Sequence, residues 1–297
     1  MDIGRSWTQR RADGMIALIS MAWGSSYLMM KVGLDGLGPF CLTALRFSLA
    51  FAAVALLFLP QLRRTTWRTL GHAAALGLLL FGVFAFLLHG METTTASNAG
   101  FLTSTTVVLV PLLNALLRRR PPEGPIALGA VLALGGIGLL SFQSGTGFHS
   151  GDLLCLGGAL CYACHILLTD RLTRRDDALL LGVWQLGFTA LYGALALLLF
   201  EPPTHPTSPT QWAAVLGLAL VCSAFGFVVQ PLAQAHTTPE HTGLLFALEP
   251  VFAALFARLF LHEALSAQGL LGAGLVLAGV LVASWPRHGA AAHATQT

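Results

Sequence analysis

Long apolar stretches alternate with short polar connections along the whole chain. A helix that crosses the hydrocarbon core of a bilayer needs about 20 mostly apolar residues, and stretches of this length recur throughout the sequence. The connections hold about ten residues or fewer and contain the Pro, Gly and charged residues that typically punctuate helices. The pattern predicts ten membrane-spanning helices, at 14–33, 40–60, 71–91, 94–117, 124–142, 151–170, 177–200, 212–234, 239–261 and 266–285.

The composition excludes a soluble protein. The 297 residues are 55% apolar and only 10% charged, whereas a soluble domain usually carries about 25% charged residues. No connection is long enough to join a separate soluble domain. We therefore expect an all-α integral membrane protein that is surrounded by the lipid bilayer.

The first apolar stretch could also be read as a secretory signal peptide, because Arg5, Arg10 and Arg11 precede it. The stretch is too long for a signal peptide, lacks a clear cleavage site of small residues, and leads directly into further spans. We interpret it as the first membrane helix.

The positions of the basic residues predict the orientation, because Lys and Arg concentrate in the cytoplasmic connections of membrane proteins. With a cytoplasmic N-terminus, thirteen of the sixteen Lys and Arg residues fall in cytoplasmic segments, the exceptions being Lys31, Arg46 and Arg258. We therefore expect a multi-pass protein of the cytoplasmic (inner) membrane with both termini in the cytoplasm. The net charge of +3 follows from this topology and does not indicate a nucleic-acid partner.

The second half of the chain repeats the first at an offset of 139 residues, without insertions. Each half contains five predicted spans, an odd number, so the second half must enter the membrane inverted. We expect a first five-helix repeat at 1–147, a second, inverted repeat at 148–288, and a short polar tail at 289–297. The offset aligns Pro111 with Pro250, Arg119 with Arg258, Phe86 with Phe225, Gly135 with Gly274, and Trp23-Gly24 with Tyr162-Ala163.

Inverted repeats are a recurrent design of secondary transporters, because two similar halves can exchange conformations around one central site. The predicted fold is therefore ten transmembrane helices in two inverted five-helix repeats around a central cavity, working by alternating access. A non-transporting membrane scaffold or sensor is the alternative, and an intramembrane enzyme is a weaker one, since the only acidic doublet, Asp176-Asp177, has no catalytic partner. The absence of a G-x-x-x-x-G-K-[ST] phosphate loop excludes ATP-driven transport by this chain alone.

Short motifs in a fixed order cover nearly the whole chain. They are Trp23-Gly24-Ser25-Ser26 with Lys31, Pro39, Leu45-Arg46-Phe47, Thr94 to Phe101, Val110-Pro111-Leu112, Leu248-Glu249-Pro250-Val251 and His262-Glu263-Ala264-Leu265-Ser266. Together they resemble the EamA-type branch of the drug/metabolite transporter (DMT) superfamily. The resemblance implies a ten-helix inner-membrane carrier, often a metabolite exporter, with a cavity lined mainly by helices 1, 3, 4, 6, 8 and 9. Tyr162-Ala163 in place of a Trp-Ala pair and His262 in place of Gly depart from the family pattern and leave the substrate open.

Polar and aromatic side chains form stripes on single helix faces. Trp23, Ser26 and Tyr27 lie at i, i+3 and i+4 of the first helix, and the repeat places Tyr162 and His165 on the matching face of the sixth. Polar groups avoid lipid, because no water is present there to bond them. Hydrogen bonds between helices, worth about 0.6 kcal/mol each, are the alternative to a cavity wall for any one side chain. Further candidates for the cavity wall are Asn98, Thr105, Gln230, Gln234 and Thr242.

Glu249 lies near the middle of the ninth predicted helix. A charge at that depth costs about 2.5–3.5 kcal/mol on insertion scales. Pro250 follows directly and removes a backbone hydrogen bond, which weakens the helix there. Glu249 could bind a substrate ammonium or a proton, or it could be a structural residue that stabilises the bend.

Three prolines within spans, Pro111, Pro231 and Pro250, are candidate flex points for alternating access, or are simply tolerated kinks. Arg46, within the second helix, could pair with a carboxylate, cap backbone carbonyls or extend to the membrane surface, and a structural role is favoured. Lys31 at the end of the first helix could be an interfacial anchor, which we favour, or a contact for an anionic substrate.

Two apparent metal motifs do not predict a metal site. Cys161 and Cys164 have C-x-x-C spacing but lie mid-helix without a second pair, and His236, Glu240 and His241 lie near a helix end. We expect no metal, no cofactor and no catalytic residue.

Few charges fall inside the predicted spans, which disfavours a nucleotide sugar and favours a small amino-acid-like zwitterion or a lipophilic cation. Protons are candidate partners. Gly-rich fifth and tenth helices predict close packing, compatible with a monomer or a homodimer.

Overall fold

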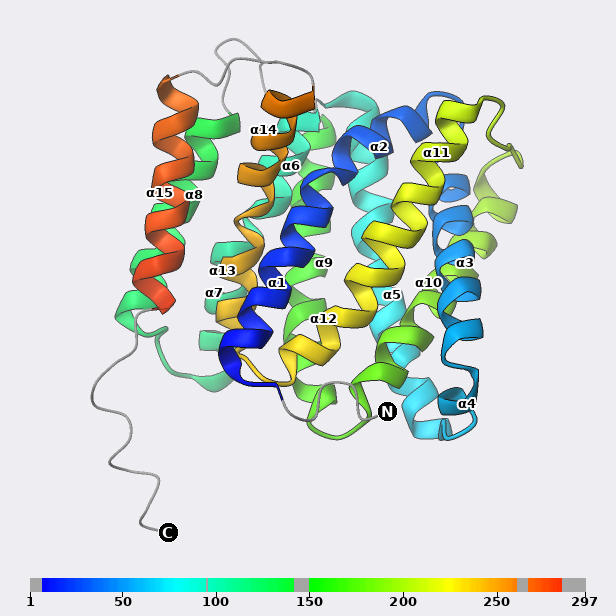
Figure 1. The fold of residues 1–297 in the computed structure, drawn as a ribbon, viewed down its shortest axis with the longest axis horizontal. Helices are drawn as coiled ribbons and strands as arrows, with labels where there is room; N and C mark the ends of the chain where they lie inside the picture. The colour runs from blue at the N-terminus through cyan, green and yellow to red at the C-terminus, as the bar shows by residue number, and fades with distance from the viewer. Residues whose placement is uncertain (1–6, 95, 142–149, 261–266, 285–297) are drawn as a thin grey trace.

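The computed structural model describes residues 7–94, 96–141, 150–260 and 267–284, and this part of the chain is a bundle of helices without strands (Figure 1). The prediction of an all-α membrane protein is confirmed. The predicted polar tail at 289–297 lies outside the described residues. The elements are α1 (Gln9–Gly24), α2 (Ser26–Leu34), α3 (Pro39–Leu57), α4 (Leu59–Leu62), α5 (Trp67–Thr93), α6 (Ala96–Ser104), α7 (Thr106–Arg118), α8 (Gly124–Ser141), α9 (Ser150–Thr173), α10 (Ala178–Phe200), α11 (Pro209–Gly217), the π-helix η1 (Leu218–Phe225), α12 (Gly226–Gln234), α13 (Pro239–Phe246), α14 (Glu249–Phe260) and α15 (Ala267–Ser284).

Seven continuous or nearly continuous helical segments among the described residues are long and apolar enough to cross a membrane. Two shorter apolar helices, 124–139 and 267–283, accompany them. Each of the ten predicted segments coincides with one helix or with consecutive helices, whereas the short α4 was not predicted. The distribution of side chains also fits lipid: large apolar residues such as Leu56 and Leu199 are exposed, and polar residues such as Thr43 and Gln185 are fully buried.

The helices begin where the sequence supplies capping residues. Ser208 forms a capping box with Gln211 at the start of α11, and Asp177 accepts hydrogen bonds from two backbone N–H groups of α10. Pro39, Pro209 and Pro239 occupy first turns, where a missing N–H leaves no bond unmade. These caps set where the polar connections end and the spans start.

Helices α8 and α15 lie side by side at one edge of the bundle (Figure 1) and pack unusually closely. A Cβ atom at Gly136 would lie 2.5 Å from the carbonyl oxygen of Gly272, and one at Gly129 would lie 2.6 Å from that of Gly279. The predicted close packing is confirmed here, and it joins two helices of one chain.

Three of the spans that the sequence predicts as continuous are interrupted in the structure. The breaks fall at Ser25 between α1 and α2, at Thr105 between α6 and α7, and at residues 247–248 between α13 and α14. At each break a backbone N–H bonds three residues back, as for Thr105 with Leu102 at 3.2 Å and Ala247 with Leu244 at 3.0 Å. A fourth irregularity is the π-helix η1, a type of segment often found at functional sites.

Candidate functional site: a small cavity at the helix breaks

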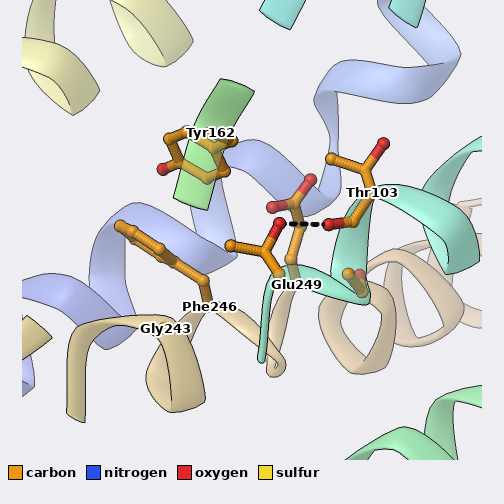
Figure 2. Close-up of a pocket in the computed structure, with 7 residues that line it drawn as sticks. Thr103, Tyr162, Gly243, Phe246 and Glu249 are labelled. Atoms are coloured by element: carbon orange, nitrogen blue, oxygen red, sulfur yellow. Dashed lines mark hydrogen bonds between the residues drawn. The ribbon is translucent and has the colours of Figure 1, made fainter. Parts of the chain in front are cut away.

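A small cavity lies where the interrupted helices converge (Figure 2). It offers about 10 Å³ to the centres of water molecules, and roughly 10–15 Å³ is needed to hold one water. In this structure the cavity is therefore about the size of one water molecule. The lining residues are Thr103, Ser104, Thr106, Tyr162, Gly243, Phe246 and Glu249.

Glu249 supplies the carboxylate of this cavity. It is the first residue of α14 and only 9% exposed, and Figure 2 shows its side chain extending between Tyr162 and Thr103. The phenol of Tyr27 lies next to it. A carboxylate is also favoured at a helix N-terminus, where the free N–H groups carry partial positive charge. The break between α13 and α14 thus positions an acidic group near the middle of the bundle.

Two buried hydroxyls that line the cavity, those of Tyr162 and Thr103, have no hydrogen-bond partner within the part of the chain that the structure describes. Leaving a buried donor or acceptor unsatisfied costs about 1–3 kcal/mol. Neighbouring Thr106 is satisfied, because its hydroxyl donates to the Thr103 carbonyl at 2.6 Å. The unsatisfied pair and the Glu249 carboxylate are therefore available to a polar ligand.

An aromatic wall closes one side of the cavity. The Trp23 ring lies 4.8 Å from Phe227, 4.9 Å from Phe246 and 6.0 Å from Tyr162, centroid to centroid. The Trp23 indole N–H donates to the carbonyl of Cys222 in η1 at 2.7 Å. This bond connects the wall to the π-helix.

A buried hydrogen-bond chain supports the wall from behind. Pro231 cannot donate to the carbonyl of Phe227, four residues earlier, and the side-chain amide of Gln185 donates to that carbonyl instead, at 2.6 Å. The other end of Gln185 bonds His165 Nε2 at 2.8 Å. Gln234 similarly ties α12 to α9 by donating to the Ile166 carbonyl at 3.2 Å. These polar residues hold helices together around the cavity.

The structure brings together four of the candidates predicted from sequence, Trp23, Tyr27, Tyr162 and Glu249. His165, Gln230 and Gln234 are buried close by and bond to other residues of α9, α10 and α12.

Other candidates lie apart from the lining. The hydroxyls of Thr105 and Thr242 donate to backbone carbonyls three and four residues earlier, at 2.5 Å and 3.0 Å, and Ser26 is buried on α2. The side chain of Asn98 lies outside the described residues.

Sequence reasoning missed Thr103, Ser104 and Gly243 as lining residues, whereas the polar pattern of the fourth span includes Thr106 and Phe246 shares a helix face with Glu249. Residues beside a helix break are candidates for a cavity lining, so knowledge of the breaks could have identified them. No proline in α6 marks the break at Thr105. Pro111 lies beyond the break at Thr105, within α7, whereas Pro250 is the second residue of α14.

Arg46 is buried on α3, 1% exposed, and so does not extend to the membrane surface. Its Nε donates to the Ser223 hydroxyl of η1 at 3.0 Å, and its guanidinium lies 4.4 Å from the centre of the Phe84 ring. Lys31, by contrast, is exposed near the end of α2, as expected of an interfacial anchor.

Polar contacts link helix ends at the lower edge of the bundle in Figure 1. The Asn114 amide of α7 donates to Glu240 of α13, and Arg118 donates to Asn114 at 3.1 Å. Thr237 donates to Asp13 of α1 at 2.7 Å. These contacts connect α1, α7 and α13 below the cavity.

At the upper edge, Glu201 accepts hydrogen bonds from the backbone N–H groups of Phe40 and Cys41, at 3.0 Å and 3.1 Å. Gln211 donates to the Asp35 carbonyl in the same region. The carboxylate at the start of α3 also favours that helix end electrostatically.

A multi-helix membrane protein with interrupted spans and a small polar cavity between them has the architecture of a membrane transporter. Comparison with known proteins identifies the family. The model of the EamA-like transporter family matches residues 10–142 and again residues 149–285. The chain belongs to the EamA-like transporter family.

Several similar proteins are named as transporters. An uncharacterized transporter of Archaeoglobus fulgidus is 30% identical, over 92% of this chain and 85% of its own length. A probable amino-acid metabolite efflux pump of Salmonella typhimurium is 28% identical, over 92% of this chain and 94% of its own. A probable terminal-alkyne amino-acid exporter of Streptantibioticus cattleyicolor is 27% identical, over 92% and 93%. A solved crystal structure with 23% identity and a TM-score of 0.78 covers 93% of this chain and 96% of its own and has the same fold.

Proposed function

We propose that this protein is a secondary transporter that exports a small amino-acid-like metabolite across the cytoplasmic membrane by alternating access. The observation that carries the proposal is the small cavity at the helix breaks, with the Glu249 carboxylate in its lining. Breaks at Thr105 and at residues 247–248 lie in equivalent helices of the two halves and can act as hinges. Pro111 and Pro250 weaken the same two spans, and Pro231 weakens the span that contains α12.

The proposed architecture is ten spans in two inverted repeats. The two matches to the family model begin 139 residues apart, the same offset as the internal repeat. Helix α1 begins and α15 ends at the same edge of the bundle in Figure 1, as an even number of spans requires. Both observations support repeats at 1–147 and 148–288.

The proposed orientation places the lower edge of Figure 1 in the cytoplasm. The connections that contain Arg63 and Arg64, Arg118 to Arg120, and Arg174 and Arg175 all lie at that edge. The positive-inside rule supports this orientation and cytoplasmic termini.

The chemistry of the cavity favours a substrate with an ammonium group. Glu249 supplies a negative charge, and the faces of Trp23, Tyr162 and Phe246 supply aromatic surface that attracts cations. The names of two relatives, an amino-acid metabolite efflux pump and an amino-acid exporter, support the same class. A proton can occupy the carboxylate when the substrate leaves, which would couple transport to the proton gradient.

Counterflow in proteoliposomes tests the proposal. A panel of labelled amino acids and the corresponding amines would be measured with the native protein, with Glu249→Gln and with Glu92→Gln, a control that removes an exposed carboxylate at the end of α5. We expect uptake of at least one panel member, a loss of about tenfold or more for Glu249→Gln, and near-native rates for the control. Absence of flux for the whole panel would refute the transporter proposal, and equal rates for both variants would refute the role of Glu249.

A further inference from the structure

A second hollow lies between α7 and α9 and is lined in part by exposed leucines. It offers about 220 Å³ to water-sized groups, against about 10 Å³ for the central cavity. Helix α7 begins directly after the break at Thr105, which is one of the two hinges in the proposed mechanism. The lining residues are Leu113, Leu116, Leu117, Cys164, Leu167, Leu168 and Arg171.

The groove is apolar along its length and charged at one end. Cys164, Leu168 and Arg171 lie on one face of α9, and Arg171 is in the last turn. Arg171 lies seven positions after Cys164, so the apolar part of the groove extends about 10 Å along the helix from the charged end. This direction is parallel to the acyl chains of a bilayer.

The charged end lies in the last turn of α9, where the proposed orientation places the cytoplasmic surface of the membrane. Arg171 is exposed, and among the described residues it has neither a hydrogen bond nor an ion pair. The nearby Arg174, by contrast, forms an ion pair with Asp170 at 3.0 Å. Arg171 is thus free to bind an anion just beyond the apolar groove.

The apolar wall is open to lipid. Leu116 is 74% exposed and Leu117 is 52% exposed, so a lipid chain can lie directly against them. Any lipid chain satisfies such a surface, because hydrocarbon is as apolar as Leu. Selectivity must therefore come from the headgroup.

We propose that this groove binds an anionic phospholipid, with one acyl chain along the Leu residues and the phosphate at Arg171. Basic pockets between membrane helices at the cytoplasmic side suit such headgroups. The Arg cluster at this edge, Arg118 to Arg120 and Arg174 and Arg175, adds attraction for the same leaflet. The bound lipid would bridge α7 and α9, which belong to different halves of the chain.

Native mass spectrometry of the purified full-length protein tests the proposal. Phosphatidylglycerol and phosphatidylcholine with identical chains would be titrated separately, and the apparent Kd of the first bound lipid measured. A single basic group near the membrane surface changes the affinity for anionic lipid by roughly fivefold. We expect phosphatidylglycerol to bind at least about fivefold more tightly, and Arg171→Gln to remove that preference.

Three further variants test whether the lipid binds at one site or is attracted by the general positive charge of this edge. Arg174→Gln removes a charge on the same turn that does not line the groove, and should leave the preference within twofold. Cys164→Trp fills the groove and should weaken the binding of both lipids. If Arg171→Gln does not fold, Arg171→Lys takes its place and should retain the preference for phosphatidylglycerol. Equal affinity of the native protein for the two lipids, or equal effects of Arg171→Gln and Arg174→Gln, would overturn the proposal. The test needs no transport assay, so its outcome is separate from that of the proposed transport function.

Discussion

Gly24→Ala probes the contact between the two broken helices that position Glu249. Gly24 ends α1, and a Cβ atom there would lie 2.9 Å from the Glu249 carbonyl oxygen, from the Ala253 nitrogen and from the Phe252 Cβ atom. Two of these atoms are backbone, so the added methyl group can be accommodated only if α14 moves. Overpacking of this kind typically costs about 1–3 kcal/mol.

Gly14→Ala is the matched control on the same helix. Nothing lies within 4 Å of the position of its added Cβ atom, and Ala favours helix over Gly by about 1 kcal/mol. Thermal unfolding in detergent should therefore show Gly24→Ala below the native protein and Gly14→Ala at or slightly above it. Because one of the crowded atoms is the Glu249 carbonyl oxygen, transport by Gly24→Ala should fall even at temperatures where the protein is folded. Equal Tm values for the two variants would refute the close contact between α1 and α14.

Three other substitutions test separate parts of the structure. Gln185→Leu leaves His165 and the Phe227 carbonyl without their partner and should lower stability by about 1–3 kcal/mol; an unchanged unfolding midpoint would contradict the buried chain. Gly136→Val should disrupt the α8–α15 contact and reduce folded yield, measured by size-exclusion chromatography, whereas Gly135→Val, with open space around it, should not; equal yields would show that the helices are not so close. Glu201→Gln removes the charge at the start of α3 and should lower the free energy of unfolding by about 0.3–1 kcal/mol. A loss of stability that is larger at high salt than at low salt would contradict an electrostatic origin of this effect.

The hydrophobic pattern predicts the helical segments well, because each span must place about 20 mostly apolar residues in the hydrocarbon core of the bilayer. It does not predict the breaks. The span predicted at 239–261 is divided before Glu249, and Pro250 is the local cause, but the break at Thr105 has no proline beside it. Such a break depends on tertiary packing, because neighbouring helices must bond the backbone groups that it frees.

The candidate site was predictable only where residue types are unusual for a membrane interior. Glu249 and the aromatic pair Trp23 and Tyr162 stand out from the sequence, and the cavity and its aromatic wall contain them. Thr103 does not stand out, because hydroxyl residues in helices usually bond to their own backbone, as Thr105 does. Only the three-dimensional structure distinguishes the two threonines.

The central claim is that one cavity, at the breaks around Glu249, opens to each side of the membrane in turn. Ser104→Cys, in a background without the five native cysteines, places a thiol in the cavity lining. Labelling with a membrane-impermeant maleimide would be compared in right-side-out and inside-out vesicles, with and without a transported amino acid. The account predicts labelling from both sides and protection by substrate, and labelling from one side only, regardless of substrate, would contradict it.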